Sequence, residues 1–273
     1  MQVSFIDVDG VSTRFLHAGS GPAVLLVHGV GAAADNWIRT LDAMGKRFSV
    51  YAPDNVGAGF TDIVDLKGEP PQPRMVRHLL RFMEALRIDR FSVVGHSYGG
   101  LLASLMFFAQ PARMQKLVVV SSASTFLPPD DQRRALTRSF SQLGPKDESS
   151  TLDEFRQRKQ RAAFKPESIP DELVYATFIA NSRPGRLEFY KATMAGLLAT
   201  AESNEHRVYS RLEQITVPTL VISGRDDAGC PVEIVSREVM RLRAKHLVFD
   251  KCGHFPMLEH AARFNDAVGE FLQ

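Results

Sequence analysis

Hydrophobic residues follow two alternating patterns in the first half of the chain and in its last fifth. Short continuous apolar runs, such as residues 23–27 and 117–120, are typical of strands that are buried on both faces of a sheet. Between such runs, apolar residues recur at helical spacing, as they do over residues 74–86. Strands that alternate with helices predict crossover connections and therefore a mostly parallel central sheet with helices on both faces.

The first segment has a different pattern. Residues 3–8 and 11–17 alternate between apolar and polar side chains around Asp9 and Gly10, which predicts a β-hairpin with an Asp-Gly turn. Further strands are expected at residues 48–52, 91–94, 218–223 and 246–249, and helices at residues 101–108, 232–242 and 257–272.

The alternation stops after Ser124. Residues 126–211 contain no strong strand pattern and four polar-faced helical segments, at 130–143, 152–164, 171–181 and 186–200. We therefore expect a discontinuous core made of residues 1–125 and 212–273, with residues 126–211 inserted as a helical lid, or cap.

Composition excludes several classes of function. A net charge of +2 with scattered basic residues argues against nucleic acid as a partner. No apolar run is long enough to span a membrane, and the first ten residues do not resemble a signal peptide, which predicts a cytoplasmic protein. Cys230 and Cys252 are too few for a disulfide framework. No metal-ligand spacing or phosphate loop is present, so we expect neither a metal nor a cofactor. The expected partner is a small-molecule substrate, and a second copy of the chain, as a homodimer, is the other partner considered.

The first chemical motif lies between a predicted strand and a predicted helix. Residues 95–100 have the sequence Gly-His-Ser-Tyr-Gly-Gly, so that Ser97 stands at the apex of a sharp strand-turn-helix. Gly95 and Gly99 would remove the two Cβ atoms that collide in such a turn. The turn would expose the Ser97 hydroxyl at the N-terminus of a helix, where a developing negative charge is stabilised.

A serine nucleophile needs a base, and the base needs an acid to orient it. His254 follows the predicted strand at 246–249, which places it at the carboxyl edge of the sheet, where parallel sheets carry their chemistry. Asp226 and Asp227 follow the strand at 218–223 and lie at the same edge. The adjacent pair leaves the acid ambiguous; we favour Asp227 as the acid and Asp226 as a structural partner.

The chain order Ser97, Asp227, His254 resembles that of the α/β-hydrolase superfamily, and the resemblance extends over the whole length. It implies a serine hydrolase with a helical lid, in which the second Asp of the pair is the acid. It also implies an oxyanion hole made by the backbone N–H groups of Val30 and Tyr98. His28 and Gly29 would then shape the oxyanion loop, as Gly95 and Gly99 shape the turn at Ser97.

The resemblance also narrows the reaction. A serine nucleophile argues against haloalkane dehalogenases and epoxide hydrolases, which use an aspartate. An apolar pocket is expected, with walls supplied by Phe126, Phe140, Phe178, Met194, Leu197 and Phe255. Such a pocket suits a small or medium hydrophobic ester, thioester or lactone, so the main hypothesis is a carboxylic ester hydrolase with an acyl-enzyme on Ser97.

Two alternatives remain. The segments around His28, Asp227 and His254 look like those of meta-cleavage product hydrolases, which cleave a carbon–carbon bond in a 2-hydroxy-6-oxo-dienoate. The chain departs from them in having Phe255 where a Trp often follows the histidine. It also lacks their lid arginine within residues 171–181, where Arg183 or Arg186 could take its place. The less favoured alternative is a ligand-sensing receptor of the same fold, against which the pair Gly99-Gly100 argues.

Overall fold

The computed structural model describes residues 1–143 and 150–273, and within them eight strands form one sheet in the order β1-β2-β4-β3-β5-β6-β7-β8. The β1–β2 and β2–β4 pairs are antiparallel and all the others are parallel. The strands are β1 (Gln2–Val8), β2 (Val11–Ala18), β3 (Ala23–Val27), β4 (Ser49–Pro53), β5 (Phe91–His96), β6 (Met114–Val120), β7 (Thr219–Gly224) and β8 (Lys245–Phe249). The predicted mostly parallel sheet is confirmed.

The first hairpin forms because its turn can adopt two positive φ angles. Asp9 has φ 53° and Gly10 has φ 81°, the left-handed pair that a two-residue type I′ turn requires. Gln2 then pairs with His17 and Val8 with Val11 along the whole hairpin.

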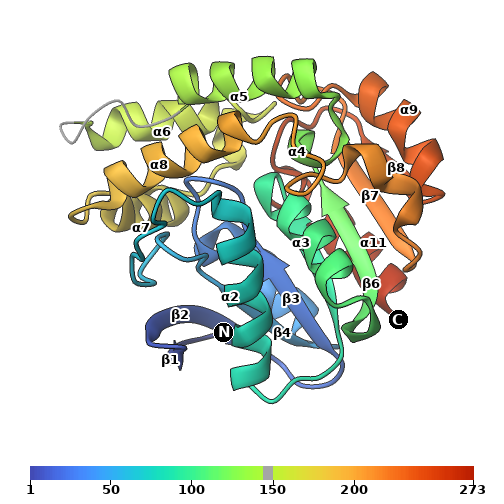
Figure 1. Ribbon diagram of the computed structural model, residues 1–273, viewed down its shortest axis with the longest axis horizontal. Coiled ribbons are helices and arrows are strands. Elements are labelled where there is room, and N and C mark those ends of the chain that lie inside the picture. The colour runs from blue at the N-terminus through green and yellow to red at the C-terminus, as the bar shows by residue number, and fades with distance from the viewer. Residues whose placement is uncertain (144–149) are drawn as a thin grey trace.

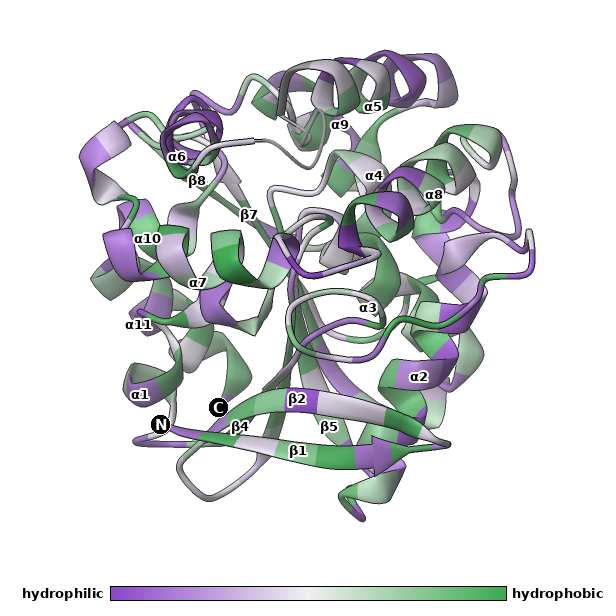
Figure 2. Ribbon diagram, turned by 90° about the vertical axis from the view of Figure 1, so that its left-hand side faces the viewer, coloured by the Kyte–Doolittle hydropathy of each residue, from purple (hydrophilic) through white to green (hydrophobic). Residues whose placement is uncertain are grey.

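Helices cover both faces of the sheet, which explains the continuous apolar runs. Val93 belongs to one buried cluster and Val94 to another, because successive side chains point to opposite faces of a strand. Figures 1 and 2 show α2 (Pro71–Ala85) and α3 (Tyr98–Ala109) on one side of the sheet. The short α1 (Leu41–Met44), α10 (Pro256–Glu259) and α11 (Ala261–Leu272) lie on the other side (Figure 2). On the first side, α9 (Val232–Leu242) packs against the same apolar cluster as α2 and α3.

The segment between β6 and β7 is helical in its described residues and lies across one end of the sheet (Figure 1). Its main helices are α4 (Ala123–Phe126), α5 (Pro129–Leu143), α6 (Leu152–Gln160), α7 (Asp171–Asn181) and α8 (Arg186–Ala199). Thr151 and Glu154 form a capping box that begins α6. Figure 2 shows that α6 is mainly hydrophilic. The division into a core and a lid at residues 126 and 211 stays a prediction.

Two helix boundaries differ from those expected. The helix expected over residues 74–86 begins earlier, at Pro71, because a proline in the first helical turn loses no hydrogen bond. The predicted last helix is divided at His260, whose φ of −133° and ψ of 47° are not helical. In the described residues, no helix is both long enough and apolar enough to cross a membrane.

Candidate active site

The turn between β5 and α3 holds Ser97 in a strained conformation. Ser97 has φ 56° and ψ −122°, a region that residues other than glycine rarely adopt. A Cβ atom on Gly95 would lie 2.2 Å from the Gly99 carbonyl oxygen, and one on Gly99 would lie 2.2 Å from the Val27 carbonyl oxygen. Both glycines are therefore sterically required, and the partly exposed Ser97 side chain stands at the N-terminus of α3.

The loops after β7 and β8 bring Asp227 against His254. Asp227 Oδ2 accepts a hydrogen bond of 2.7 Å from His254 Nδ1, which leaves the opposite ring nitrogen, Nε2, for a substrate or nucleophile. Asp227 Oδ1 accepts from the backbone N–H groups of Gly229 (2.9 Å) and Cys230 (3.2 Å), so the carboxylate is fixed in orientation. Asp227 is buried, whereas His254 is partly exposed.

Asp226 takes no part in this contact. It is exposed, and its Oδ2 accepts a hydrogen bond of 3.2 Å from the backbone N–H of Cys252. The Asp226 N–H also donates to the Cys252 carbonyl oxygen at 2.9 Å. Asp226 thus joins the two loops that carry Asp227 and His254. The two cysteines of these loops, Cys230 and Cys252, are buried free thiols.

The electrostatic environment suits His254 to a base. Burial by itself would lower the pKa of His254, but the charge of Asp227 and its hydrogen bond outweigh burial and raise this pKa above its ordinary value. Ser97 and His254 line the same two cavities, and in the described residues no hydrogen bond joins their side chains. Catalytic hydrogen bonds often tighten only when a substrate is bound.

Val30 and Tyr98, whose backbone N–H groups are expected to form the oxyanion hole, lie beside Ser97 in the walls of both cavities. Tyr98 is the first residue of α3, so its N–H has no acceptor within the helix. Among the described residues, the Val30 N–H donates to no protein acceptor. The two donors expected to form an oxyanion hole are therefore available.

His28 and Gly29 shape the loop that carries Val30. The buried His28 ring donates from Nδ1 to the Gly29 carbonyl oxygen (2.8 Å) and accepts at Nε2 from the Asn55 N–H (2.9 Å). Burial lowers the pKa of His28, so the ring is neutral and acts as a tie between two loops. A Cβ atom on Gly29 would lie 3.0 Å from Ser97 Cβ, so glycine leaves room for the serine.

Sequence reasoning missed the role of His96. Its ring is buried and makes two contacts: Nε2 donates to the His254 carbonyl oxygen (2.8 Å), and Nδ1 accepts from Asn36 Nδ2 (3.3 Å). Burial lowers the pKa of His96 well below its ordinary value. The position directly before Ser97 was the only signal, and it does not reveal the partner 158 residues away.

Glu259 was also missed as a support of the loop around His254. Its carboxylate accepts from the backbone N–H groups of Gly253 (3.0 Å) and Phe255 (3.0 Å), on either side of His254. It also accepts from the Phe164 N–H (2.8 Å), in the segment after α6. The His254 N–H donates to the Ala162 carbonyl oxygen at 2.8 Å, so the helical segment and the histidine loop are directly connected.

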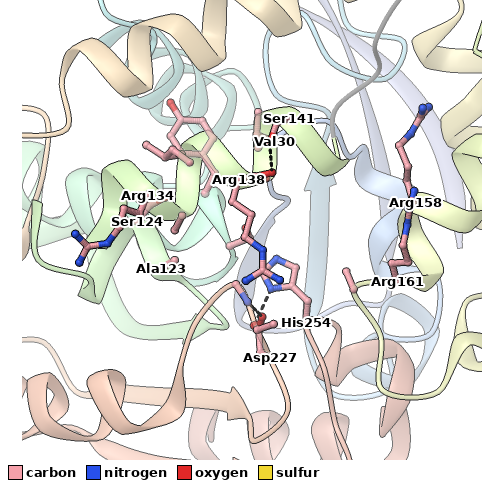
Figure 3. Close-up of a pocket in the computed structure, with 18 of the residues that line it drawn as sticks. Val30, Ala123, Ser124, Arg134, Arg138, Ser141, Arg158, Arg161, Asp227 and His254 are labelled. Carbon is pink, nitrogen blue, oxygen red and sulfur yellow. Dashed lines mark hydrogen bonds and ion pairs between the residues drawn. The ribbon is translucent and has the colours of Figure 1, made fainter. Parts of the chain in front are cut away.

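Ser97 lies where two cavities meet. The larger has a volume of about 1050 Å³ and is lined by side chains of α5 and α6, Asp227 and His254. The smaller has a volume of about 170 Å³ and is lined by the loop at His28, by His96, by Phe255 and by residues of α6 and α8. Figure 3 shows the larger cavity, with Asp227 and His254 joined below it and Arg138 extending over them from α5.

The wall of the larger cavity carries more charge than the sequence predicted. Four arginines line the larger cavity, namely Arg134, Arg138, Arg158 and Arg161. Of the expected apolar walls, Leu197 lines the larger cavity and Phe255 the smaller.

Four residues expected in the pocket line neither cavity: Phe126, Phe140, Phe178 and Met194. Phe126 and Met194 are fully buried in the core between α3 and the helical segment. Phe178 packs edge-on against Phe155, with ring centroids 6.0 Å apart, and Phe140 is exposed and stacks on Tyr190. Their apolar side chains serve packing between helices, so their assignment to the pocket was wrong.

Proteins of known function resemble this chain over nearly its full length. The 2-hydroxymuconate semialdehyde hydrolase of Pseudomonas sp. (strain CF600) is 28% identical over 270 residues, covering 96% of this chain and 91% of that protein. The 2-hydroxy-6-oxo-6-(2'-aminophenyl)hexa-2,4-dienoic acid hydrolase of Metapseudomonas resinovorans is 29% identical over 280 residues, covering 98% and 90%.

Solved structures give the same result. A variant of the meta-cleavage product hydrolase CumD from Pseudomonas fluorescens IP01 superposes with a TM-score of 0.81 at 28% identity, covering 98% of this chain and 96% of that one. The 2-hydroxy-6-oxo-6-phenylhexa-2,4-dienoate hydrolase of Rhodococcus sp. strain RHA1 has a TM-score of 0.82 at 25% identity, with 99% of both chains covered. A model of the alpha/beta hydrolase family matches residues 24–267. The chain therefore belongs to the alpha/beta hydrolase family.

Proposed function

We propose that this hydrolase cleaves the carbon–carbon bond of a 2-hydroxy-6-oxo-dienoate, with Ser97, His254 and Asp227 as its catalytic triad. The observation that carries the choice is the charge of the smaller cavity beside Ser97. Three cationic side chains line it, those of Arg158, Lys159 and Arg186, and none of the described residues lining it is an Asp or Glu. A dienoate carries a carboxylate, which such a cavity attracts, whereas a simple neutral ester gains nothing from it.

The first half of the proposed reaction follows from the chemistry of the substrate. In the keto tautomer of the dienoate, the proton of the 2-hydroxyl group has moved to C5 and C2 is a ketone. The negative charge that C5 receives when the C5–C6 bond breaks is therefore delocalised onto the oxygen of this ketone. Ser97 Oγ attacks the C6 carbonyl, His254 Nε2 takes the serine proton, and the oxyanion is held by the N–H groups of Val30 and Tyr98. The C5–C6 bond then breaks, its electron pair remains on the dienolate, and His254 returns the proton to this leaving group.

The second half is an ordinary acyl-enzyme hydrolysis. His254 takes a proton from water as the hydroxide attacks the acyl carbonyl. The Ser97–acyl bond then breaks as His254 returns this proton to Ser97 Oγ, which releases a carboxylic acid and restores the free enzyme. Each oxyanion donor would contribute about 10²- to 10³-fold in rate. The acyl group would occupy the larger cavity, whose volume of about 1050 Å³ leaves room for a substantial substituent on C6.

The carboxylic ester hypothesis becomes the second choice. It rested on an apolar pocket, whereas six cationic side chains line the two cavities at Ser97. The similar proteins of known function are named as hydrolases of 2-hydroxymuconate semialdehyde and of a 2-hydroxy-6-oxo-hexa-2,4-dienoic acid. An acyl-enzyme on Ser97 is common to both reactions, so slow ester hydrolysis is an expected side activity.

A direct comparison of substrates tests the proposal. The purified protein would be assayed with 2-hydroxy-6-oxo-6-phenylhexa-2,4-dienoate, by loss of its absorbance, and with p-nitrophenyl acetate and butyrate. We expect kcat/KM for the dienoate to exceed that for either ester, and the Ser97→Ala variant to lose about 10⁶-fold in kcat. Faster ester turnover, with no cleavage of the dienoate, would restore the ester hydrolase hypothesis.

A further inference from the structure

Helix α6 places a lysine in the smaller cavity. Lys159 lines this cavity together with Ser97, His254 and Phe255. Its ammonium lies 5.8 Å from the centre of the Phe155 ring and 5.8 Å from the centre of the Phe255 ring. The cation therefore stands over two aromatic faces, one of them directly next to His254, rather than in open solvent.

This ammonium has no anionic partner in the described part of the chain, where no carboxylate lies within ion-pair distance of Lys159 Nζ. The acid that attracts it from further away, Asp35, is already bound by Arg14 through hydrogen bonds of 2.8 and 2.9 Å. Other charged or titratable groups near Lys159 are Arg158 on its own helix and His28, His96 and His254 across the cavity. Burial lowers the pKa of Lys159 to about 8, so near neutral pH it is still mainly protonated.

Arg183 and Arg186, the two arginines that the sequence offers for binding a carboxylate, are engaged elsewhere. The Arg186 guanidinium donates to the carbonyl oxygens of Thr61 (2.6 Å) and Ala58 (3.4 Å). Arg183 donates to the Gly59 carbonyl oxygen and lines neither cavity. Helix α7 contains no Lys or Arg, so it supplies no cation here. Its buried Thr177 donates to the Leu173 carbonyl oxygen (2.7 Å).

We propose that Lys159 binds the substrate carboxylate and so makes this hydrolase select anionic dienoates. The inference rests on the proposed function for the identity of the substrate, but the anion site itself does not depend on which bond is cleaved. An ammonium poised over Phe155 and Phe255 has lost part of its hydration, so a carboxylate that enters replaces water with a charge-assisted hydrogen bond. The plane of the Phe255 ring beside it suits the flat diene that follows the carboxylate.

The test uses two matched ligands that carry no cleavable bond. Sorbate (hexa-2,4-dienoate) and sorbic alcohol (hexa-2,4-dien-1-ol) differ in the carboxylate and share the diene. Each would be measured as a competitive inhibitor of p-nitrophenyl acetate hydrolysis in the wild type, Lys159→Met and Lys159→Arg. Lys165→Met, which removes an exposed positive charge from the same helical segment, is the control.

We expect Lys159→Met to raise the inhibition constant of sorbate by about 10- to 100-fold and that of sorbic alcohol by less than about 3-fold. Lys159→Arg should keep most of the preference for sorbate, and Lys165→Met should keep all of it. In the wild type, sorbate inhibition should weaken above pH about 8, where Lys159 loses its proton, while inhibition by sorbic alcohol does not follow that change. Melting temperatures of all variants would show that they are folded.

The outcomes separate this inference from the proposed function. If Lys159→Met binds sorbate as tightly as the wild type, the inference is overturned, whether or not the dienoate substrate is cleaved. If the wild type cleaves no dienoate but its sorbate preference disappears in Lys159→Met, the anion site stands and the proposed function fails. An equal loss of sorbate binding in Lys165→Met would show a general charge effect and would also overturn the inference.

Discussion

His96 Nε2 donates a hydrogen bond of 2.8 Å to the carbonyl oxygen of His254. The residue before the candidate nucleophile thus holds the backbone of the candidate base. Because burial keeps His96 neutral and Asn36 donates to its other nitrogen, its tautomer is defined and the contact is independent of pH near neutrality. A direct hydrogen bond therefore connects the strand of the nucleophile to the loop of the base.

Replacing this ring should affect both stability and catalysis. His96→Leu leaves the His254 carbonyl oxygen and the Asn36 amide without a partner, so the free energy of unfolding should fall by about 1–3 kcal/mol. Displacement of the His254 loop should lower kcat by about 10- to 100-fold. Urea unfolding and steady-state kinetics measure the two effects. His96→Gln, which can still donate to His254, should lose less of both; equal losses in the two variants would contradict a role for this hydrogen bond.

The two adjacent aspartates should differ sharply in their effect on catalysis. Asp227→Asn cannot accept from His254 Nδ1–H in the same way and should lower kcat by about 10⁴-fold. Asp226→Asn weakens one loop contact to the Cys252 N–H and should lower kcat by less than about 10-fold. Steady-state kinetics of both variants test which aspartate is the acid. Comparable losses of kcat in the two variants would show that the acid is wrongly assigned.

The pH dependence should report the pKa of His254. A base must be unprotonated, so kcat/KM should rise with pH through the pKa of His254 in the free enzyme, which Asp227 raises above the ordinary value of about 6.5. On the acid side, log kcat/KM should rise with a slope of one against pH, as for the loss of a single proton. Burial keeps His28 and His96 neutral over this range, so they do not contribute.

In Asp227→Asn the acid limb should move to lower pH, since burial then acts without the opposing charge. Asp226→Asn serves as the matched control and should leave the limb in place. A limb that does not move in Asp227→Asn would exclude the Asp227–His254 pair as its origin.

Glu259 should support the histidine loop and the helical segment at once. In Glu259→Gln one oxygen is replaced by an NH2 group, which faces the N–H donors of Gly253, Phe255 or Phe164. We expect a loss of about 1–3 kcal/mol in the free energy of unfolding, with a lower kcat. Glu188→Gln removes only an exposed ion pair with Lys191 and should cost at most about 0.5 kcal/mol. Unfolding curves that coincide for the two variants would rule out this role.

The sequence by itself determined the elements of the core and the order of the candidate triad. Apolar runs such as residues 23–27 identify strands that are covered on both faces. Successive side chains of a strand point to opposite faces, so a run without polar residues indicates burial on both. The turn at Ser97 was local in part, since a Cβ atom on Gly95 would collide with the carbonyl oxygen of Gly99, four residues later. His254 could be placed from the strand before it, because parallel strands end at one edge of the sheet.

Which groups meet at that edge depends on how the loops fold and how the helices pack. Asp226 and Asp227 are adjacent in sequence, and only the loop fold, with the N–H groups of Gly229 and Cys230 on one carboxylate, turns Asp227 toward His254. The pocket walls depend on how helices pack, so Phe126 entered the core while charged residues of α5 and α6 line the cavities. Lys159 is one of several charges on α6, and no spacing along a polar helix reveals which of them faces a cavity whose other walls come from separate loops and helices.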